Sequence, residues 1–136
     1  MLLRVAHYLA MRRHVAGEAP REACGLVAGR GGVSTEVFPI TNVLHSSVRY
    51  RMAPEEQLRA FRRIEAAGDT LLAIYHSHPA GPPTLSSTDL REAAYLSAVY
   101  LVWAPVGTTW LVRGFLLDGR GVREILVRLA GSNAWG

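Results

Sequence analysis

A short apolar segment that ends in two histidines constrains this 136-residue chain more than any other feature. Residues 70–75, Thr-Leu-Leu-Ala-Ile-Tyr, follow a glycine at position 68 and precede Pro79, and they predict a buried strand. His76 and His78 stand at the end of this strand. Because residues i and i+2 of a strand point to the same side of a sheet, both imidazoles can bind one metal ion.

Asp89 follows the histidine pair at a distance that suits a third metal ligand. The intervening loop, residues 80–85, is rich in proline and glycine and can lead the chain back. Two histidines and a carboxylate leave one position of a zinc ion open for water, which distinguishes catalytic sites from closed structural ones. Ser86 and Asp89 also approximate a helix capping box. The two interpretations are compatible, because a rigid cap holds a ligand in place.

One pattern resembles the signature of the JAMM (MPN-plus) zinc metalloprotease family in its bacterial and archaeal form: His76-x-His78, seven residues, Ser86, two residues and Asp89. The resemblance implies zinc bound by His76, His78 and Asp89. It also implies that Glu22 activates the zinc-bound water and later protonates the leaving amine, and that Ser86 donates a hydrogen bond to the oxyanion. Spacing alone leaves the base open, because the chain has several other glutamates.

The resemblance covers roughly residues 1–115. Residues 20–29, Pro-Arg-Glu-Ala-Cys-Gly-Leu-Val-Ala-Gly, are similar to the family's early strand, and residues 41–43 and 50–54 are similar to its middle section. The implied fold is an α/β protein, a three-layer α/β/α sandwich with a mixed sheet, like that of cytidine deaminases. We expect one domain over residues 1–130 and a frayed tail over residues 131–136.

The activity that the resemblance implies is that of a zinc-dependent peptidase or isopeptidase, which cuts after the C-terminal Gly-Gly of a ubiquitin-like protein. Eukaryotic members carry insertions beside the site that grip ubiquitin chains. The corresponding segments of this chain, residues 44–51 and 104–109, are short. A small ubiquitin-like protein of the sulfur-carrier type is therefore a better expectation than polyubiquitin.

Two functions of other classes compete with this one. A non-catalytic MPN-type scaffold would bind protein partners without chemistry, but such scaffolds lack some of the ligands that are present here. A zinc nucleoside deaminase needs His-x-Glu and Pro-Cys-x-x-Cys motifs, which a chain with one cysteine cannot supply. A role linked to DNA carries little weight.

The single cysteine, Cys24, has three interpretations. It could be a nucleophile paired with His76, or a fourth ligand that closes the zinc site. The apolar strand around it favours a third interpretation, a buried and unreactive thiol. His7, His14 and His45 have no partners at ligand spacing and are expected to be structural or exposed.

Composition sets the broad class of the protein. Length and apolar content suit one domain with its own core, and no apolar run reaches the roughly 18 residues of a membrane span. We expect a cytoplasmic protein, because the first residues lack the pattern of a signal peptide. The net charge of +4 comes from arginine alone, scattered along the chain, which disfavours nucleic acid and allows an acidic protein partner. The oligomeric state stays open, a homodimer included.

The pattern of apolar residues and turn signals predicts interleaved helices and strands. Helices are expected over residues 3–16, 54–67 and 87–96. Strands are expected over residues 23–28, 33–40, 48–52, 70–78, 98–104, 109–116 and 122–129.

Overall fold

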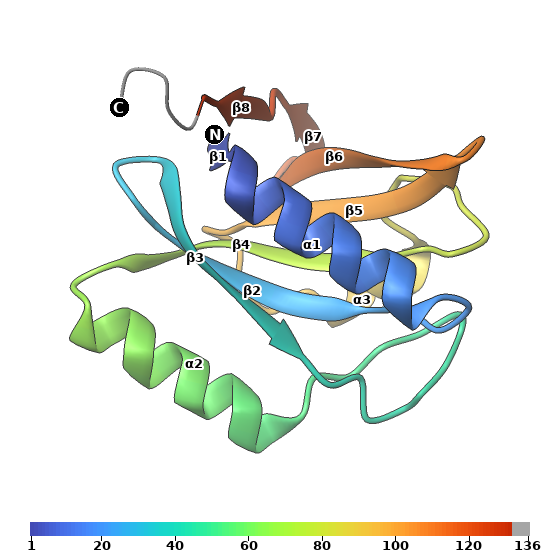
Figure 1. Ribbon diagram of the computed structural model, residues 1–136, viewed down its shortest axis with the longest axis horizontal. Helices are drawn as coiled ribbons and strands as arrows, with labels where there is room; N and C mark the ends of the chain where they lie inside the picture. The colour runs from blue at the N-terminus through green and yellow to red at the C-terminus, as the bar shows by residue number, and fades with distance from the viewer. Residues whose placement is uncertain (132–136) are drawn as a thin grey trace.

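A computed structural model describes residues 1–131 of the chain (Figure 1). Its elements follow one another in the order β1 (Leu2–Arg4), α1 (Val5–Glu18), β2 (Cys24–Arg30), β3 (Val33–Ile40), α2 (Pro54–Ala66), β4 (Thr70–Ser77), α3 (Ser87–Glu92), β5 (Val99–Val106), β6 (Thr109–Asp118), β7 (Gly121–Ile125) and β8 (Arg128–Ala130).

The strands of the described residues form one mixed sheet in the order β7-β6-β5-β4-β2-β3-β1-β8. β2 is antiparallel to both β3 and β4, whereas β4 and β5 are parallel. The carboxyl ends of β4 and β5 therefore lie side by side. Binding sites of α/β sheets form outside the carboxyl ends of neighbouring parallel strands, so this edge is a suitable place for a site.

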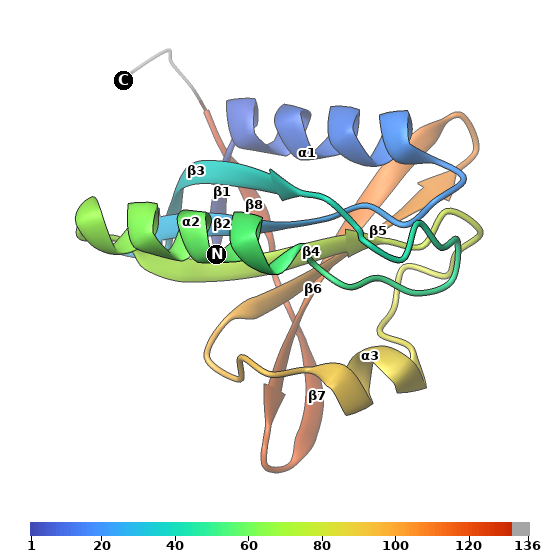
Figure 2. The same ribbon diagram turned by 90° about the horizontal axis from the view of Figure 1, so that it is seen from below.

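Helices cover both faces of the sheet, with α1 on one side and α3 on the other in Figure 2. Met11 of α1 is fully buried in one apolar cluster together with Tyr75 of β4. Ala60 of α2 lies in a second cluster with Ile74 of the same strand. Successive residues of a strand face opposite sides, so β4 contributes to both cores. The predicted three-layer sandwich with a mixed sheet is confirmed.

The start of the chain differs from its prediction. Residues 2–4 form β1 instead of the first turn of a helix, because Leu2 pairs with Val33 of β3 and with Arg128 of β8. Leu3 is fully buried between the two neighbouring strands and α1. α1 then continues to Glu18, through the glycine at which the sequence predicted its end.

Three further elements differ from their predictions. Residues 48–52 form no strand, and only an isolated bridge joins Asn42 to Met52. α3 ends at Glu92, because the chain turns back and the backbone N–H of Tyr95 donates to the Tyr100 hydroxyl. The last predicted strand is divided into β7 and β8, which lie at opposite edges of the sheet.

The remaining predicted strands and the α2 helix agree with the structure to within two residues at each end. Residues 132–136, which contain most of the expected frayed tail, lie outside the described residues. In residues 1–131, none of the helices has the length and hydropathy that crossing a membrane requires.

Candidate active site

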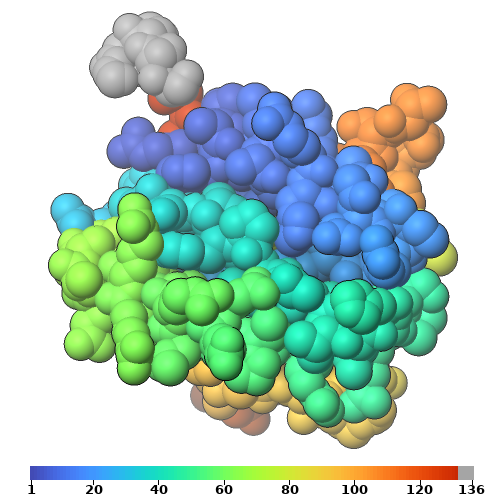
Figure 3. Space-filling model, turned by 60° about the horizontal axis from the view of Figure 1, so that its bottom comes forward, coloured from blue at the N-terminus to red at the C-terminus, as the bar shows by residue number. Residues whose placement is uncertain are grey.

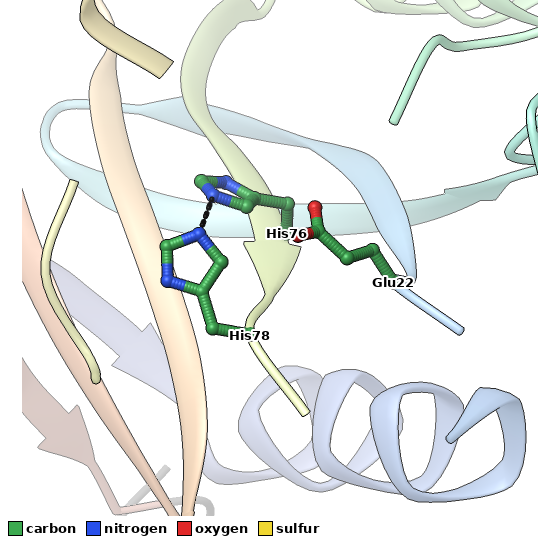
Figure 4. A group of neighbouring side chains, drawn as sticks. All are labelled: Glu22, His76 and His78. Carbon is green, nitrogen blue, oxygen red and sulfur yellow. Dashed lines mark hydrogen bonds between the residues drawn. The ribbon is translucent and has the colours of Figure 1, made fainter. Parts of the chain in front are cut away.

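Strand β4 brings His76 and His78 to one point at its carboxyl end. His76 is fully buried and pairs with Cys24 of β2 on one side and with Val102 of β5 on the other. The backbone N–H of His78 donates to the carbonyl oxygen of Trp103, 2.7 Å away, which keeps the chain extended just beyond the strand. As the i, i+2 spacing predicts, the two rings converge, with centroids 4.8 Å apart (Figure 4).

The ligand atoms of His76, His78 and Asp89 form an equilateral triangle. The two Nε2 atoms lie 3.1 Å apart, and each lies 3.1 Å from Oδ2 of Asp89. A zinc ion bound tetrahedrally at about 2.0–2.1 Å from each ligand would space them about 3.3–3.4 Å apart. The triangle therefore has the dimensions of three ligands that share one small cation.

The tautomer of His78 suits metal binding. Its Nδ1 lies 2.8 Å from the carbonyl oxygen of Pro82, and since a carbonyl only accepts, Nδ1 carries the proton. The lone pair of Nε2 is then free and points to the triangle. A hydrogen bond from the ring nitrogen that does not face the metal commonly fixes metal-binding histidines. The other ring is fixed differently, because Tyr50 stacks on His76 with a centroid distance of 4.8 Å and an interplanar angle of 26°.

Asp89 is held by the N-terminus of α3. Ser86 is the N-cap residue: its Oγ accepts from the backbone N–H of Asp89 at 3.0 Å, and its own N–H donates to Oδ2 of Asp89 at 2.8 Å. The capping box predicted from the sequence is therefore present. Burial alone would raise the pKa of Asp89, but the neighbouring His76 and His78 rings and the hydrogen bond from the Ser86 backbone N–H hold this pKa well below its usual range.

Glu22 places a second carboxylate beside the histidine pair. It lies just before β2, is 3% exposed, and one of its carboxylate oxygens lies within 4.8 Å of ring nitrogens of both His76 and His78. In the described part of the chain, Oε1 of Glu22 has no hydrogen-bond partner. Burial raises the pKa of Glu22 to about 7, which His78 opposes and Asp89 reinforces. Its carboxyl group therefore gains and loses a proton near neutral pH, as a general base requires.

The donor set fits a divalent metal ion. Glu22, His76 and His78 form a group able to hold a cation, and Asp89 brings a carboxylate oxygen even nearer to the two rings. A buried carboxylate without a hydrogen-bond partner is costly unless a cation or polar ligand compensates it. Imidazole nitrogens and carboxylate oxygens are ligands that zinc prefers.

Two clefts meet at this triangle. The smaller one is lined by Glu22, His78 and Ser86, so that the predicted base and the predicted oxyanion donor face the same space. The larger cleft, a cavity of about 250 Å³, lies on the other side of Asp89. Apolar and aromatic side chains form one part of its lining: Leu26, Met52, Ile74, Tyr50, Tyr95 and Tyr100. Polar and charged side chains form the other part: Arg49, Arg51, Gln57, Thr88 and Glu92.

Cys24 is close to the site in the sheet but not part of it. Its Sγ is buried and donates to the carbonyl oxygen of Ile40 at 3.5 Å. Burial raises the pKa of the thiol to about 12, and the charge of Glu22 adds to the effect. At neutral pH the thiolate that a nucleophile requires is therefore scarce. The metal-binding group found among the described residues does not include Cys24.

The other histidines have structural surroundings. Nδ1 of His7 lies 2.7 Å from the Ser34 hydroxyl, and Nδ1 of His14 lies 2.7 Å from the Tyr75 hydroxyl. His45 is exposed, in a turn with a positive φ of 48°. Tyr50 is a residue of the site that the sequence did not predict. No motif spacing links it to His76, and only the similarity of residues 50–54 to a known family drew attention to that segment.

Comparisons with known proteins agree with this geometry. The family model described as prokaryotic homologs of the JAB domain matches residues 4–113. A desampylase of Haloferax volcanii is 38% identical over 99 residues, which cover 71% of each chain. A probable TtuB-protein conjugate cleaving protease of Thermus thermophilus is 42% identical over 118 residues, 85% of this chain and 76% of the relative.

A third relative, the CysO-cysteine peptidase of Mycobacterium tuberculosis, is 37% identical over 95 residues, 68% of this chain and 65% of its own length. Among solved structures, the JAB1/MPN domain protein AF2198 of Archaeoglobus fulgidus aligns with a TM-score of 0.59 over 96% of this chain and 99% of its own, at 14% identity. At this identity the likeness concerns the fold alone. Because the family model spans most of the sequence, the chain belongs to the prokaryotic JAB-domain family of JAMM-type metallopeptidases.

Proposed function

We propose that this protein is a zinc-dependent peptidase or isopeptidase that hydrolyses the bond after the C-terminal Gly-Gly of a ubiquitin-like protein of the sulfur-carrier type. The observation that carries the proposal is the triangle of 3.1 Å between the Nε2 atoms of His76 and His78 and Oδ2 of Asp89. It supports these three residues as the zinc ligands. Bound there, zinc would lower the pKa of a water molecule and polarise the scissile carbonyl.

Glu22 is proposed as the general base rather than as a ligand. Oδ2 of Asp89 lies 3.1 Å from both Nε2 atoms, whereas Oε1 of Glu22 has no hydrogen-bond partner among the described residues, which favours Asp89 as the third ligand. A base must have a free oxygen, and Oε1 of Glu22 has no partner in the described residues. Glu22 takes a proton from the attacking water and then passes it to the leaving amine, so the carboxylate is regenerated in each turnover.

Ser86 is proposed as the donor that stabilises the oxyanion. Its Oγ accepts the backbone N–H of Asp89, which leaves the hydroxyl proton available. Ser86 lines the same cleft as Glu22 and His78, so this proton can point to a substrate carbonyl in that cleft. Removal of one such donor costs about 10²–10³ in rate in other enzymes.

The substrate class rests on the relatives and on the short segments beside the site. One relative is named for cleaving conjugates between TtuB and proteins, and another for cleaving CysO from cysteine. A zinc ion held by the triangle and the Ser86 hydroxyl would both approach the scissile carbonyl. This leaves little room for a side chain on the residue to which that carbonyl belongs. Glycine is therefore expected at that position, and the carrier body is expected to add affinity that an isolated tail lacks.

The test uses small ubiquitin-like carriers that end in Gly-Gly and carry a short C-terminal extension. Mass spectrometry after incubation should show cleavage directly after the second glycine, and replacement of this glycine by valine should remove most turnover. Equal rates on the carrier, its valine variant and the isolated tail peptide would indicate a general peptidase. No cleavage by a zinc-loaded, folded protein would favour a non-catalytic MPN-type scaffold.

A further inference from the structure

The side chain of Asn42 forms a complete set of hydrogen bonds beside the candidate active site. Asn42 is 8% exposed. Its Nδ2 donates to the carbonyl oxygens of Glu22 and Arg49, both 3.1 Å away. Its Oδ1 accepts from the backbone N–H groups of Leu44 and Arg51, also at 3.1 Å. An asparagine amide has two donor protons and two acceptor lone pairs, so all of them are used.

Two of these hydrogen bonds fix the backbone of Tyr50. The Arg49 carbonyl and the Arg51 N–H belong to the peptide groups on either side of Tyr50, and both bind the Asn42 amide. The Tyr50 ring stacks on His76. In residues 1–131, Nδ1 of His76 has no hydrogen-bond partner that could orient the ring instead. Apart from the contacts of Nε2 with Asp89 and His78, the orientation of His76 therefore depends on packing, to which the stacked Tyr50 ring contributes.

A third hydrogen bond fixes the backbone of Glu22. Glu22 precedes β2, and β4 holds only one end of its backbone, through the N–H of the next residue, Ala23, which donates to the Ser77 hydroxyl at 2.8 Å. Its carbonyl accepts from Asn42, and its N–H donates to the carbonyl oxygen of Ser46 at 2.8 Å. The loop of residues 41–53, which lies next to α2 on the surface in Figure 3, thus replaces a neighbouring strand for Glu22.

We propose that Asn42 is a positioning residue, which sets the Glu22 carboxylate and the Tyr50 ring against the histidine pair through one buried amide. The part that concerns Glu22 rests on the proposed function, whereas the part that concerns His76 rests only on metal binding. The amide acts through backbone groups, so neither a metal nor a substrate has to touch it. Small displacements are enough, because a shift of about 1 Å in a reacting group can cost 10²-fold in rate.

The test compares Asn42→Ala and Asn42→Asp with the unaltered protein and with Glu56→Ala. The Asp variant keeps the shape of the side chain but has no N–H to donate to Glu22 and Arg49. Glu56→Ala is the matched control: it also removes a side-chain hydrogen bond to this loop, from the N–H of Thr41 to Oε1 at 2.8 Å, but none to Glu22 or to the residues beside Tyr50. The readouts are the affinity and visible absorption spectrum of bound Co²⁺, kcat and KM on a carrier fusion, and the Tm.

Both Asn42 variants should bind Co²⁺ about tenfold more weakly with an altered spectrum, a size typical for changes in the surroundings of metal ligands. They should also lower kcat by about 10- to 100-fold at saturating metal, with a smaller effect on KM. Glu56→Ala should stay within about twofold of the unaltered protein in Co²⁺ affinity and in kcat, since the hydrogen bond of Glu56 reaches neither Glu22 nor the residues beside Tyr50. Folded Asn42 variants with a reduced Tm but unchanged Co²⁺ affinity, spectrum and kcat would overturn the proposal.

A failure of the proposed function is distinguishable from a failure of this inference. If the unaltered protein binds Co²⁺ but cleaves none of the carriers, the proposed substrate is wrong, and the Co²⁺ readouts still decide on Asn42. If Asn42→Ala does not fold, Tyr50→Leu and Tyr50→Phe take its place. Weaker Co²⁺ binding in the Leu variant only, with the ring-preserving Phe variant unaffected, supports the proposal, and equal binding in both overturns it.

Discussion

The two halves of the candidate site differ in how the chain builds them. His76, His78 and Asp89 come from neighbouring segments, the end of β4 and the first turn of α3. A strand's alternation and a helix cap place their ligand atoms 3.1 Å apart, so local rules account for most of this half.

The other half, which contains Glu22 and Tyr50, depends on contacts between distant segments. Glu22 reaches the histidines from the loop before β2, and Tyr50 covers His76 from a loop without regular strands. Long-range packing gives Glu22 its burial and its raised pKa. With the proposed ligands His76, His78 and Asp89, metal binding is encoded locally, whereas the proposed proton transfer depends on tertiary structure. The two functions should therefore be separable by mutation.

The largest effect is expected from the local half. Asp89→Ala and His78→Ala each remove one proposed ligand, so the purified protein should lose its stoichiometric zinc and all measurable turnover. Metal analysis of the purified variants checks the first expectation. Added zinc should raise the Tm of the unaltered protein but not that of Asp89→Ala, because only a bound ligand stabilises the folded state. Full zinc occupancy in both folded variants would mean that the ligands lie elsewhere.

A smaller loss, confined to catalysis, is expected from the distant half. Glu22→Gln keeps the shape of the side chain but cannot accept a proton from water, so turnover should fall by about 10²–10⁴-fold. Zinc content should remain that of the unaltered protein, and the Tm should not decrease, since the variant no longer buries an ionisable carboxyl. Loss of zinc together with activity would instead make Glu22 a ligand, which its approach within 4.8 Å of both histidines also permits.

The same comparison explains how much the sequence predicted. The strand that leads to His76 and His78 and the cap formed by Ser86 and Asp89 follow from periodicity and spacing, whereas the resemblance to a family implied the three-layer fold, and the structure contains all of them. Glu22 was chosen among several glutamates by resemblance to a family, because no local pattern marks a buried base. Tyr50 was not predicted as a site residue, since an aromatic ring that stacks on a distant histidine leaves no periodic signal. Short strands such as β1 and β8 depend on pairing partners far along the chain.

A moderate loss of stability is expected from Gly25→Ala, at the contact between β2 and β4. Gly25 pairs with Tyr75, and a Cβ at position 25 would lie 2.3 Å from the buried Tyr75 ring. This ring cannot easily move, because its hydroxyl binds His14 at 2.7 Å. Gly25→Ala should lower the free energy of unfolding by about 1–3 kcal/mol through overpacking. Gly17→Ala in α1, where a Cβ meets nothing within 4 Å, is the control and should leave the stability unchanged or raise it. Denaturant unfolding of both variants measures the difference.

The smallest effect is expected from Cys24→Ser. Cys24 lies beside His76 in the sheet, so this variant tests whether proximity alone makes a residue part of the site. Cys24→Ser places a hydroxyl in an apolar position, which should cost about 1–2 kcal/mol of unfolding free energy. The carbonyl of Ile40, which accepts from the thiol at 3.5 Å, can accept from the serine hydroxyl and offset part of this cost. Zinc content should stay unchanged, because the metal-binding group found among the described residues does not include Cys24. The kcat should stay unchanged as well, because a thiol whose pKa is about 12 supplies almost no thiolate at neutral pH. A folded, zinc-loaded but inactive Cys24→Ser protein would show that the thiol takes part in the reaction, and the boundary between the two halves of the site would then have to include β2.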